Sequence, residues 1–396
     1  MKGLVFKGII TQVSLDQPLG YLGHYNLWGH GSSIMTQGTP AHSSFTELPL
    51  AQMVKLATDG IPPNDCQIAL QPTYSGIVPW YVRYRETTAQ FLRRLAHDYG
   101  QWFYYDGQVL NFGKGPDQPL SLLMGRDLQQ LGMGVRTRPL QFSDYTYISN
   151  LDKLVSGGSP PSIGGLDNNG MVALGASHGV FPQAGNTNVA PRVWAPSELL
   201  FFNGNRKSAM GGDLAYVSGK SVVPGVSVGV TLSISAEKQT GKATFMSEPV
   251  GSYWVTQVSH NLDKSGHYMN TFEGIPASVL TMPVYGLEQP KAEPQMATVK
   301  RNKDPDGLGR VRVQFWWMSG DEMTPWIRVM MPHGGFYKNK NKTRGYFFIP
   351  EKGDQVMVDF RYRSDGPARS RQALCAGQHS PRQKHRLQLH QHRRCP

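Results

Sequence analysis

Apolar and polar residues alternate strictly over several short segments between positions 296 and 360. In residues 310–317 every second side chain, from Val311 to Trp317, is apolar. This period of two predicts a strand with one buried face. The same alternation predicts strands at 296–299, 326–331, 346–349 and 355–360. Four or five short strands within about 65 residues, without a helix, predict a small antiparallel barrel.

Glycines and prolines lie where this barrel has to turn. The sequence Asp-Pro-Asp-Gly-Leu-Gly at 304–309 precedes the strand at 310–317, and its proline and two glycines favour a chain reversal. Gly345 and Gly353 lie between the later strands. Short strands joined by such turns are typical of a barrel of the OB type.

Apolar residues spaced three to four apart predict helices at 49–58, 87–99 and 197–211. The clearest is 87–99, where Thr87 and Gln90 fit a capping box and Gly100 fits a left-handed cap. Its apolar stripe leaves four residues on the expected solvent side: Arg93, Arg94, His97 and Asp98.

The remaining pattern is mostly that of strands. They are expected at 1–15, 21–37, 78–84, 101–105, 108–112, 213–218, 228–234, 252–260 and 268–275, with Asp106-Gly107 as a hairpin turn. Residues 151–192 are rich in Gly, Ser, Pro and Asn and are expected to form loops. A segment with several prolines, 281–297, is expected to be a linker. The fold class is therefore mainly β with minor α, which the 44 glycines and 28 prolines also favour.

Three motifs in the barrel resemble a known family. They are D-P-D-G-L-G-R-V-R-V-Q-F-W-W at 304–317, T-P-W-I-R-V-M-M-P-H-G-G at 324–335 and G-Y-F-F-I-P-E-K-G-D-Q-V-M-V-D-F at 345–360. Together they resemble the OB-fold domain of VgrG, the spike protein of type VI secretion systems, which is related to the hub and spike of contractile phage tails.

The first 280 residues resemble the hub part of the same family. The motifs are F-K-G-I-I-T-Q-V at 6–13, S-F-T-E at 44–47, Y-R-E-T-T-A-Q-F-L-R-R-L-A-H-D-Y-G-Q-W-F-Y-Y-D-G at 84–107, Y-W-V-T-Q-V-S-H at 253–260 and Y-M-N-T-F-E-G-I-P at 268–276. The resemblance implies phage-hub-like β barrels with small helices, followed by an OB-fold barrel. It divides the chain into a first hub barrel region (1–150), loops (151–192), a second hub barrel region (193–280), a linker (281–297), an OB domain (298–367) and a basic tail (368–396).

The resemblance implies a mechanical role and no catalytic residue, cofactor or metal. A VgrG-like spike is a homotrimer that sits on a tube of hexameric rings, contacts baseplate components, and carries effectors and a spike-tip protein. Residues expected as barrel framework and trimer-facing positions are Gly309, Arg310, Val311, Val313, Phe315, Trp326, Ile327, Val329, Gly345, Gly353, Val356 and Val358.

Both ends depart from the family. A further barrel segment usually precedes the motif at 6–13, and a trimeric β-helix usually follows the OB barrel. The resemblance therefore implies a chain truncated at both ends, and we expect it to fold in parts and to assemble poorly.

Charge is distributed unevenly along the chain, whose formal net charge is +12. Residues 1–297 hold 20 basic and 20 acidic residues, residues 298–367 hold 13 and 8, and residues 368–396 hold 7 and none. A tail without acidic residues, aromatics or alternation suggests that a frameshift replaced the native continuation from Ala368. Sequencing of the coding DNA tests this hypothesis, which is wrong if no single-base change restores an apolar strand after Pro367.

Candidate chemistry is sparse. The G-x-S-x-G match at 225–229 would need a helix after the serine, yet a strand pattern follows. Asp304 and Asp306 lack the later glutamate of a calcium loop, and a turn explains both. His333 has no partner that the sequence can name. Possible zinc ligands gather in the tail without tight pairs or a core around them: Cys375, His379, His385, His390, His392 and Cys395.

The main alternative function is binding of single-stranded nucleic acid, because OB barrels often combine a basic groove with stacking aromatics. Trp316 and Trp326, together with Arg310, Arg312, Arg328 and the loop 338–344, would supply such a surface. Exposed aromatics are equally expected to be buried against sister subunits of an oligomer.

No run of residues approaches the roughly 20 apolar residues of a membrane helix, and the N-terminus shows no signal peptide. We therefore expect synthesis in the cytoplasm and, by the resemblance, export through the injection apparatus. Three scattered cysteines do not form a disulfide framework.

Overall fold

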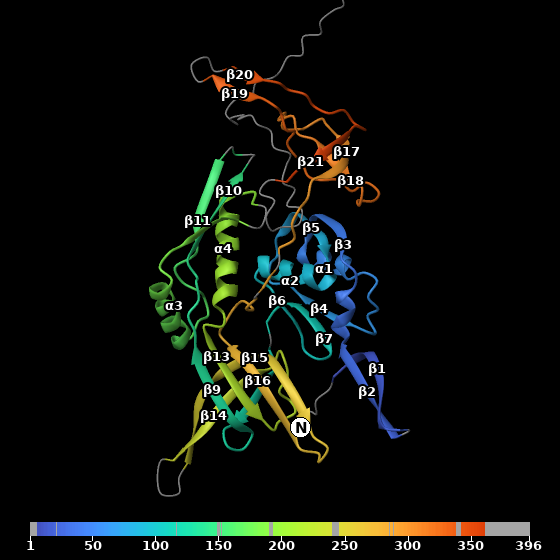
Figure 1. Cartoon of the computed structure of the whole chain (residues 1–396). Coiled ribbons are helices and arrows are strands. Elements are labelled where there is room, and N and C mark those ends of the chain that lie inside the picture. The colour runs from blue at the N-terminus through green and yellow to red at the C-terminus, as the bar shows by residue number, and fades with distance from the viewer. Residues whose placement is uncertain are drawn as a thin grey trace, which may run out of the picture.

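The computed structural model describes residues 6–20, 22–115, 117–148, 151, 153–189, 193–239, 245–284, 286–287, 289–337 and 342–360. Figure 1 shows an elongated molecule in which the OB part lies at one end, a mixed α and β region in the middle, and a large sheet at the other end. The predictions for the tail from Ala368, including its six possible zinc ligands, concern residues outside the described ones.

The N-terminal part combines a hairpin, two small sheets and two helices. Its elements are β1 (Gly8–Leu19), β2 (Leu22–Gly31), a 3-10 helix (Ser32–Gln37), β3 (Ala41–Pro49), α1 (Leu50–Ala57), β4 (Gln67–Gln71), β5 (Ile77–Glu86), α2 (Thr88–Asp98), β6 (Trp102–Tyr105) and β7 (Val109–Gly113). Strands β1 and β2 pair only with each other, as do β3 and β5, and β4, β7 and β6 form a third sheet within the described residues. The capping box of α2 is present, with both Thr87 and Gln90 hydrogen bonded as the sequence predicts.

The large sheet has six strands in the order β8-β14-β15-β16-β13-β9. Its members are β8 (Pro119–Leu123), β9 (Leu128–Val135), β13 (Ala215–Ser221), β14 (Thr231–Gln239), β15 (Phe245–Leu262) and β16 (Tyr268–Pro276). Strands from before residue 150 and after residue 193 thus share one core, which includes Leu122, Leu128, Val217, Leu232 and Phe272.

The middle region contains β10 (Phe142–Ile148), β11 (Lys153–Gly158), α3 (Asn168–Val180), β12 (Gly185–Asn188) and α4 (Pro196–Gly211). Our expectation of loops throughout 151–192 is therefore wrong. The buried face of α3 consists of Gly170, Ala173, Leu174 and Ser177. Because three of these four are glycine, alanine or serine, hydrophobic periodicity does not reveal the helix.

The OB part contains β17 (Gln295–Arg301), β18 (Arg312–Phe315), β19 (Gly334–Tyr337), β20 (Lys342–Gly345) and β21 (Gln355–Val358). Strand β17 is central and pairs antiparallel with β18 and β21. The sequence-predicted turn is present, since the Gly307 N–H donates to the Asp304 carbonyl at 3.1 Å.

Two strands expected from alternation in the OB part are not regular strands. Residues 326–331 reach the sheet only through a bridge between Val311 and Ile327. Residues 346–349 leave the hairpin β19–β20 after the Tyr346 N–H donates to the His333 carbonyl at 3.2 Å. Prolines at 325, 332 and 350 flank both segments, and proline cannot donate to a strand ladder. Ile327 and Met331 of the first segment are still buried, whereas residues 346–349 are exposed throughout.

Candidate assembly surfaces

Strand β5 belongs to two hydrophobic cores at once. Trp80, Val82 and Tyr84 face the OB part, where they join a cluster that includes Val299, Val311, Val313, Phe315 and Ile327. Tyr81, which lies between Trp80 and Val82 in the sequence, faces the other way, toward α2 and the N-terminal core. Trp80 is 4% exposed and Val82 is 1% exposed. The OB part is therefore fixed to the N-terminal part by a shared core, with β5 as the common element.

Polar contacts border this joint. The Ser44 hydroxyl donates to a Glu322 carboxylate oxygen at 3.0 Å across 278 positions of sequence. The His42 ring stacks on Trp317 with 5.5 Å between ring centroids. Burial, aided by the Arg85 charge, lowers the pKa of His42, which favours the neutral ring at this contact. These contacts fix the orientation of the OB part relative to β3.

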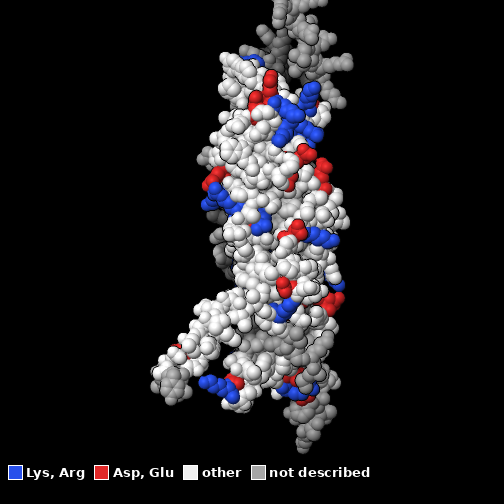
Figure 2. Space-filling model, turned by 90° about the vertical axis from the view of Figure 1, so that its right-hand side faces the viewer, with Lys and Arg blue, Asp and Glu red and all other residues white. Residues whose placement is uncertain are grey.

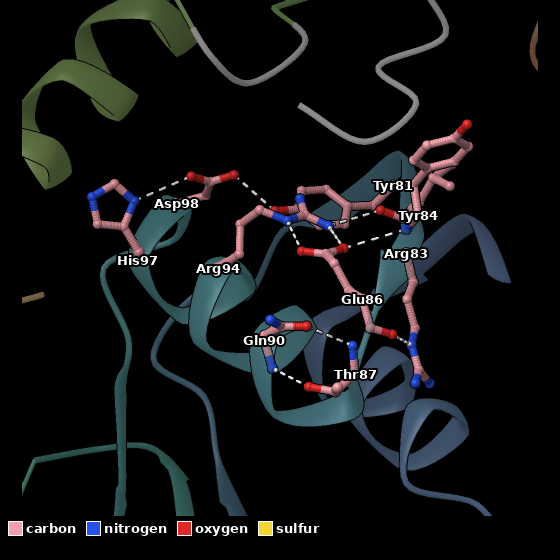
Figure 3. Close-up of polar contacts among 10 residues, drawn as sticks. Tyr81, Arg83, Tyr84, Glu86, Thr87, Gln90, Arg94, His97 and Asp98 are labelled. Atoms are coloured by element: carbon pink, nitrogen blue, oxygen red, sulfur yellow. Dashed lines mark hydrogen bonds and ion pairs between the residues drawn. The ribbon is translucent and has the colours of Figure 1, made fainter. Parts of the chain in front are cut away.

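A buried charged network ties β5 to α2 (Figure 3). The Arg94 guanidinium donates from Nε to Glu86 Oε1 at 2.7 Å and from Nη2 to Glu86 Oε2 at 2.8 Å. Nη2 also donates to the Val82 carbonyl at 2.8 Å, and the guanidinium lies 4.5 Å from the centroid of the Tyr81 ring. Burial alone lowers the pKa of Arg94, but the neighbouring Tyr81 and Glu86 raise it overall, so this side chain stays charged.

The network continues to α4. The Tyr81 hydroxyl donates to Asp98 Oδ2 at 2.7 Å, and the Asn205 amide donates to the Asp98 carbonyl at 2.9 Å. Burial raises the pKa of Tyr81 well above its ordinary value, which keeps the hydroxyl protonated as the donor. Arg94 is 1% exposed and Asp98 is 3% exposed, so our expectation that both face solvent is wrong. Their burial depends on partners from β5 and α4, which the helix pattern alone does not show.

A second charged cluster closes the turn before β18. Arg310 donates from Nε to Asp304 Oδ2 and from Nη2 to Asp304 Oδ1, both at 2.7 Å, and from Nη2 to Asp306 Oδ2 at 2.5 Å. Burial raises the pKa of Asp304, but hydrogen bonds from Arg310 and the backbone outweigh it and hold this pKa below its ordinary value. Both carboxylates are thus occupied by an arginine, which agrees with a turn and not with a cation site.

The expected framework residues lie in three settings. Val311, Val313, Phe315, Ile327 and Val358 are buried in the cluster shared with β5, and Val329 and Val356 pack against it half-buried. Arg310 is buried in the turn, and Trp326 is half-buried. Gly309, Gly345 and Gly353 have φ values of 67°, 135° and 102°, which favour glycine.

Those residues of the proposed nucleic-acid surface that the structure describes do not form a basic groove. Arg310 is neutralised by two aspartates, Arg312 donates to the Thr324 carbonyl at 2.7 Å, and Arg328 lies over the Tyr147 ring at 5.3 Å. Trp316 is 73% exposed, whereas Trp326 is half-buried. The internal contacts of these arginines leave no continuous basic groove among them, and residues 338–341 of the expected loop lie outside the described residues.

Other candidates also lack a site. Ser227 lies in a turn that enters β14, without the helix of a nucleophile elbow. His333 is exposed, and its backbone carbonyl joins the start of the 346–349 segment. Within the described residues, no group of three or more His, Cys, Asp or Glu side chains could hold a metal ion. None of the helices described is both long and apolar enough to cross a membrane.

Large apolar side chains are exposed at many places in the described residues, including the following three surfaces. The first is the OB segment 346–349, where Tyr346 is 60% and Phe348 is 66% exposed. The second, which we call the hairpin face, comprises Ile10, Val13, Leu15, Tyr25 and Leu27 on β1 and β2. The third, the β9 edge, comprises β9 with Met133 and Val135, each more than half exposed. Contiguous apolar surface of this kind marks places where proteins assemble.

The hairpin β1–β2 has few charged side chains. Figure 2 shows the hairpin β1–β2 as a projecting arm at the lower left that is white along almost its whole length. Elsewhere on this face, basic and acidic side chains are interspersed, with no large patch of one sign. Interface centres are depleted of charged residues, so the hairpin has the composition of a contact surface.

Sequence reasoning missed the β9 edge. The signal was available in part: Leu-Gln-Gln-Leu-Gly-Met-Gly-Val at 128–135 contains no charged residue and no proline. Two glycines and two glutamines weaken its strand pattern, so pattern reading did not predict a strand there.

Comparison with known proteins places the OB part in a family. Residues 295–364 match the type VI secretion system/phage-baseplate injector OB domain. The OB domain of this chain is therefore of the baseplate type and not of a nucleic-acid-binding type. A comparison with curated proteins gives no match.

The chain is similar in fold, over most of its length, to the E. coli c3393 protein, a component of the type VI secretion system that exhibits structural similarity to T4 bacteriophage tail proteins gp27 and gp5. The TM-score is 0.51 at 15% identity, over 90% of this chain and 80% of that one. Tail proteins from Neisseria meningitidis MC58 and from prophage MuSo2 of Shewanella oneidensis give TM-scores of 0.48 and 0.46 at 10% and 9% identity. They cover 69% of this chain each, and 81% and 78% of their own chains. The predicted fold class, a mainly β phage-hub-like body followed by an OB-fold domain, is confirmed.

Proposed function

We propose that this chain is a structural spike and hub component of a contractile injection apparatus of the type VI secretion kind. The observation that carries the proposal is the injector-type OB domain at 295–364, joined through the shared core of β5 to a body with the fold of a secretion-system component. The role is mechanical, since a hub and spike transmit force and position other proteins. It requires no catalytic residue, cofactor or metal.

The proposed partners follow from this role. They are two further copies of the chain in a homotrimer, a hexameric tube protein, baseplate components, effectors and a spike-tip protein. The hub regions, 1–150 and 193–280, would match the tube, and the OB domain, 298–367, would gather the three chains. The exposed aromatics at 346–349 support a contact in the assembly, because such a surface is costly in a monomer in water. Trp326 and Val356, both half-buried, are the framework positions best placed to take part.

The proposed route is assembly in the cytoplasm followed by export through the apparatus. The experiment deletes the coding gene in cells that carry the apparatus and measures tube protein in the culture medium. We expect export to stop and to return when the full chain is supplied in trans. Export that continues without the chain would contradict the proposal.

A further inference from the structure

The hydrophobic core of the six-stranded sheet is uncovered at one edge. Val217 and Ala215 of β13 are 0% and 6% exposed, and they pair with Met133 and Val135 of β9. Directly paired residues share one face of a sheet, so these two β9 side chains continue the core face. They are nevertheless 59% and 54% exposed. The core face of the sheet therefore includes β9, but its side chains are buried only as far as β13.

The backbone of β9 is also open at this edge. Among the described strands β9 pairs with β13 alone, apart from one bridge between Leu128 and Met124, and β9 ends the sheet. Natural edge strands are usually protected by charge, proline or shortness, and the opposite edge strand, β8, is short and begins with Pro119. Strand β9 spans eight residues with no charge and no proline. Helix α3, which packs beside β9, also contains no charged residue.

The hairpin β1–β2 exposes an apolar face that could cover this edge. The pairs Val13 with Leu27 and Leu15 with Tyr25 place these four apolar side chains on one face of the hairpin. Their exposed fractions range from 49% to 72%. The opposite face is mainly polar, with Ser14 paired to Asn26, and also holds Trp28, which is 46% exposed. A two-stranded hairpin is marginally stable alone, and more strands or a packed face stabilise it.

We propose that the hairpin β1–β2 of one copy pairs along the β9 edge of a second copy and places the hairpin face over the uncovered core beside α3. The inference rests on the proposed function, which supplies the second copy. Neither the hairpin face nor the β9 edge contains a charged side chain. The apolar side chains of the hairpin face would cover the exposed Met133 and Val135 of the β9 edge. The hairpin cannot reach β9 of its own chain. Its base is held by bonds from the Lys7 N–H to the Gly107 carbonyl and from the Tyr105 hydroxyl to the Lys7 carbonyl, and β9 lies on another side of the molecule (Figure 1).

The contact joins two different surfaces, so it is heterologous and can close a ring of copies. It also locates an interface in the hub, independent of any contact that the OB domains make.

The decisive experiment is cross-linking between two variants of the full chain. Cys375 and Cys395 are replaced by serine in both, and Cys66 is buried, which protects it from reagents. One chain carries Leu27→Cys and the other Met133→Cys. A short bismaleimide is added to each chain alone and to their mixture. We expect a covalent dimer in the mixture and little in either chain alone. A dimer from one variant alone would indicate a symmetric contact and overturn the proposal.

A second pair of variants separates this interface from the proposed function. Val13→Lys on the hairpin face should weaken self-association about tenfold or more, because the lysine would be buried without a partner. Ser14→Lys, on the polar face of the same strand, is the matched control and should change it little. Self-association that persists without the mixed cross-link would overturn this inference and leave the spike function standing. A chain that stays monomeric and still supports export would also overturn the inference, because export would then need no contact between copies.

Discussion

Replacement of Arg94 by methionine should destabilise the region around α2 strongly. The side chain of Glu86 is 6% exposed and receives two hydrogen bonds from Arg94. Methionine keeps most of the volume but leaves the Glu86 carboxylate buried without its counterion. Removing one partner of a buried ion pair costs about 3–5 kcal/mol. The exposed neighbour Arg93 provides the control, since exposed ion pairs contribute at most about 1 kcal/mol and Arg93→Met should therefore destabilise the chain much less.

The assay has to read α2 itself, because separate hydrophobic cores can unfold separately. Hydrogen exchange of the α2 amides measures local opening. A cost of about 3–5 kcal/mol corresponds to exchange roughly 100- to 5,000-fold faster in Arg94→Met than in the wild-type chain. Arg94→Lys should fall between the two, because lysine keeps the charge but not the two-pronged geometry.

A double-mutant cycle tests the pairing directly. Glu86→Gln should also destabilise α2, but Glu86→Gln with Arg94→Met should cost less than the two single changes together. We expect a coupling of about 2–3 kcal/mol, as for residues in direct contact. Additive effects, or exchange in Arg94→Met within threefold of wild type, would refute the reasoning.

Three further changes test other parts of the structure. Trp80→Ala should open the joint between β5 and the OB part at a cost of about 3–5 kcal/mol, seen as faster proteolysis within 277–294. Asp304, whose pKa is lowered, stabilises the fold at neutral pH, and this contribution is lost as pH falls below about 4. Asp304→Asn should therefore lower the melting temperature at pH 7 and narrow the difference from wild type at pH 3. Gly353→Ala should cost about 1 kcal/mol for its positive φ, and Gly345→Ala more, because its Cβ would also clash with the His333 carbonyl; urea denaturation compares them.

Pattern reading predicted those parts of the fold that local chemistry determines. The capping box of α2 and the glycines of the OB turns need only nearby residues, and both are present. The motifs at 304–360 also led to the injector family, which the match at 295–364 supports. Parts that depend on distant partners were missed. The burial of Arg94 requires Glu86 from another element, and the strand at β9 is stabilised by pairing with β13, some 85 positions later in the chain.

The candidate surfaces also combine features that local sequence predicts with features that depend on distant parts of the chain. The hairpin face can be predicted from alternation once the register of β1 and β2 is known, and that register shifts at two places that the sequence does not mark. The aromatics at 346–349 were expected in a strand and instead lie exposed in extended chain. Exposure depends on what the rest of the chain covers, which no local pattern reports.

As the proposed spike and hub subunit, this chain would sit on a tube of hexameric rings. Native mass spectrometry of the full chain mixed with the tube protein from the same cells measures that complex. We expect three copies of this chain with one hexameric ring. Absence of a complex, which is the poor assembly that the sequence resemblance implied, would contradict the proposed function, as would binding of one copy to each tube subunit.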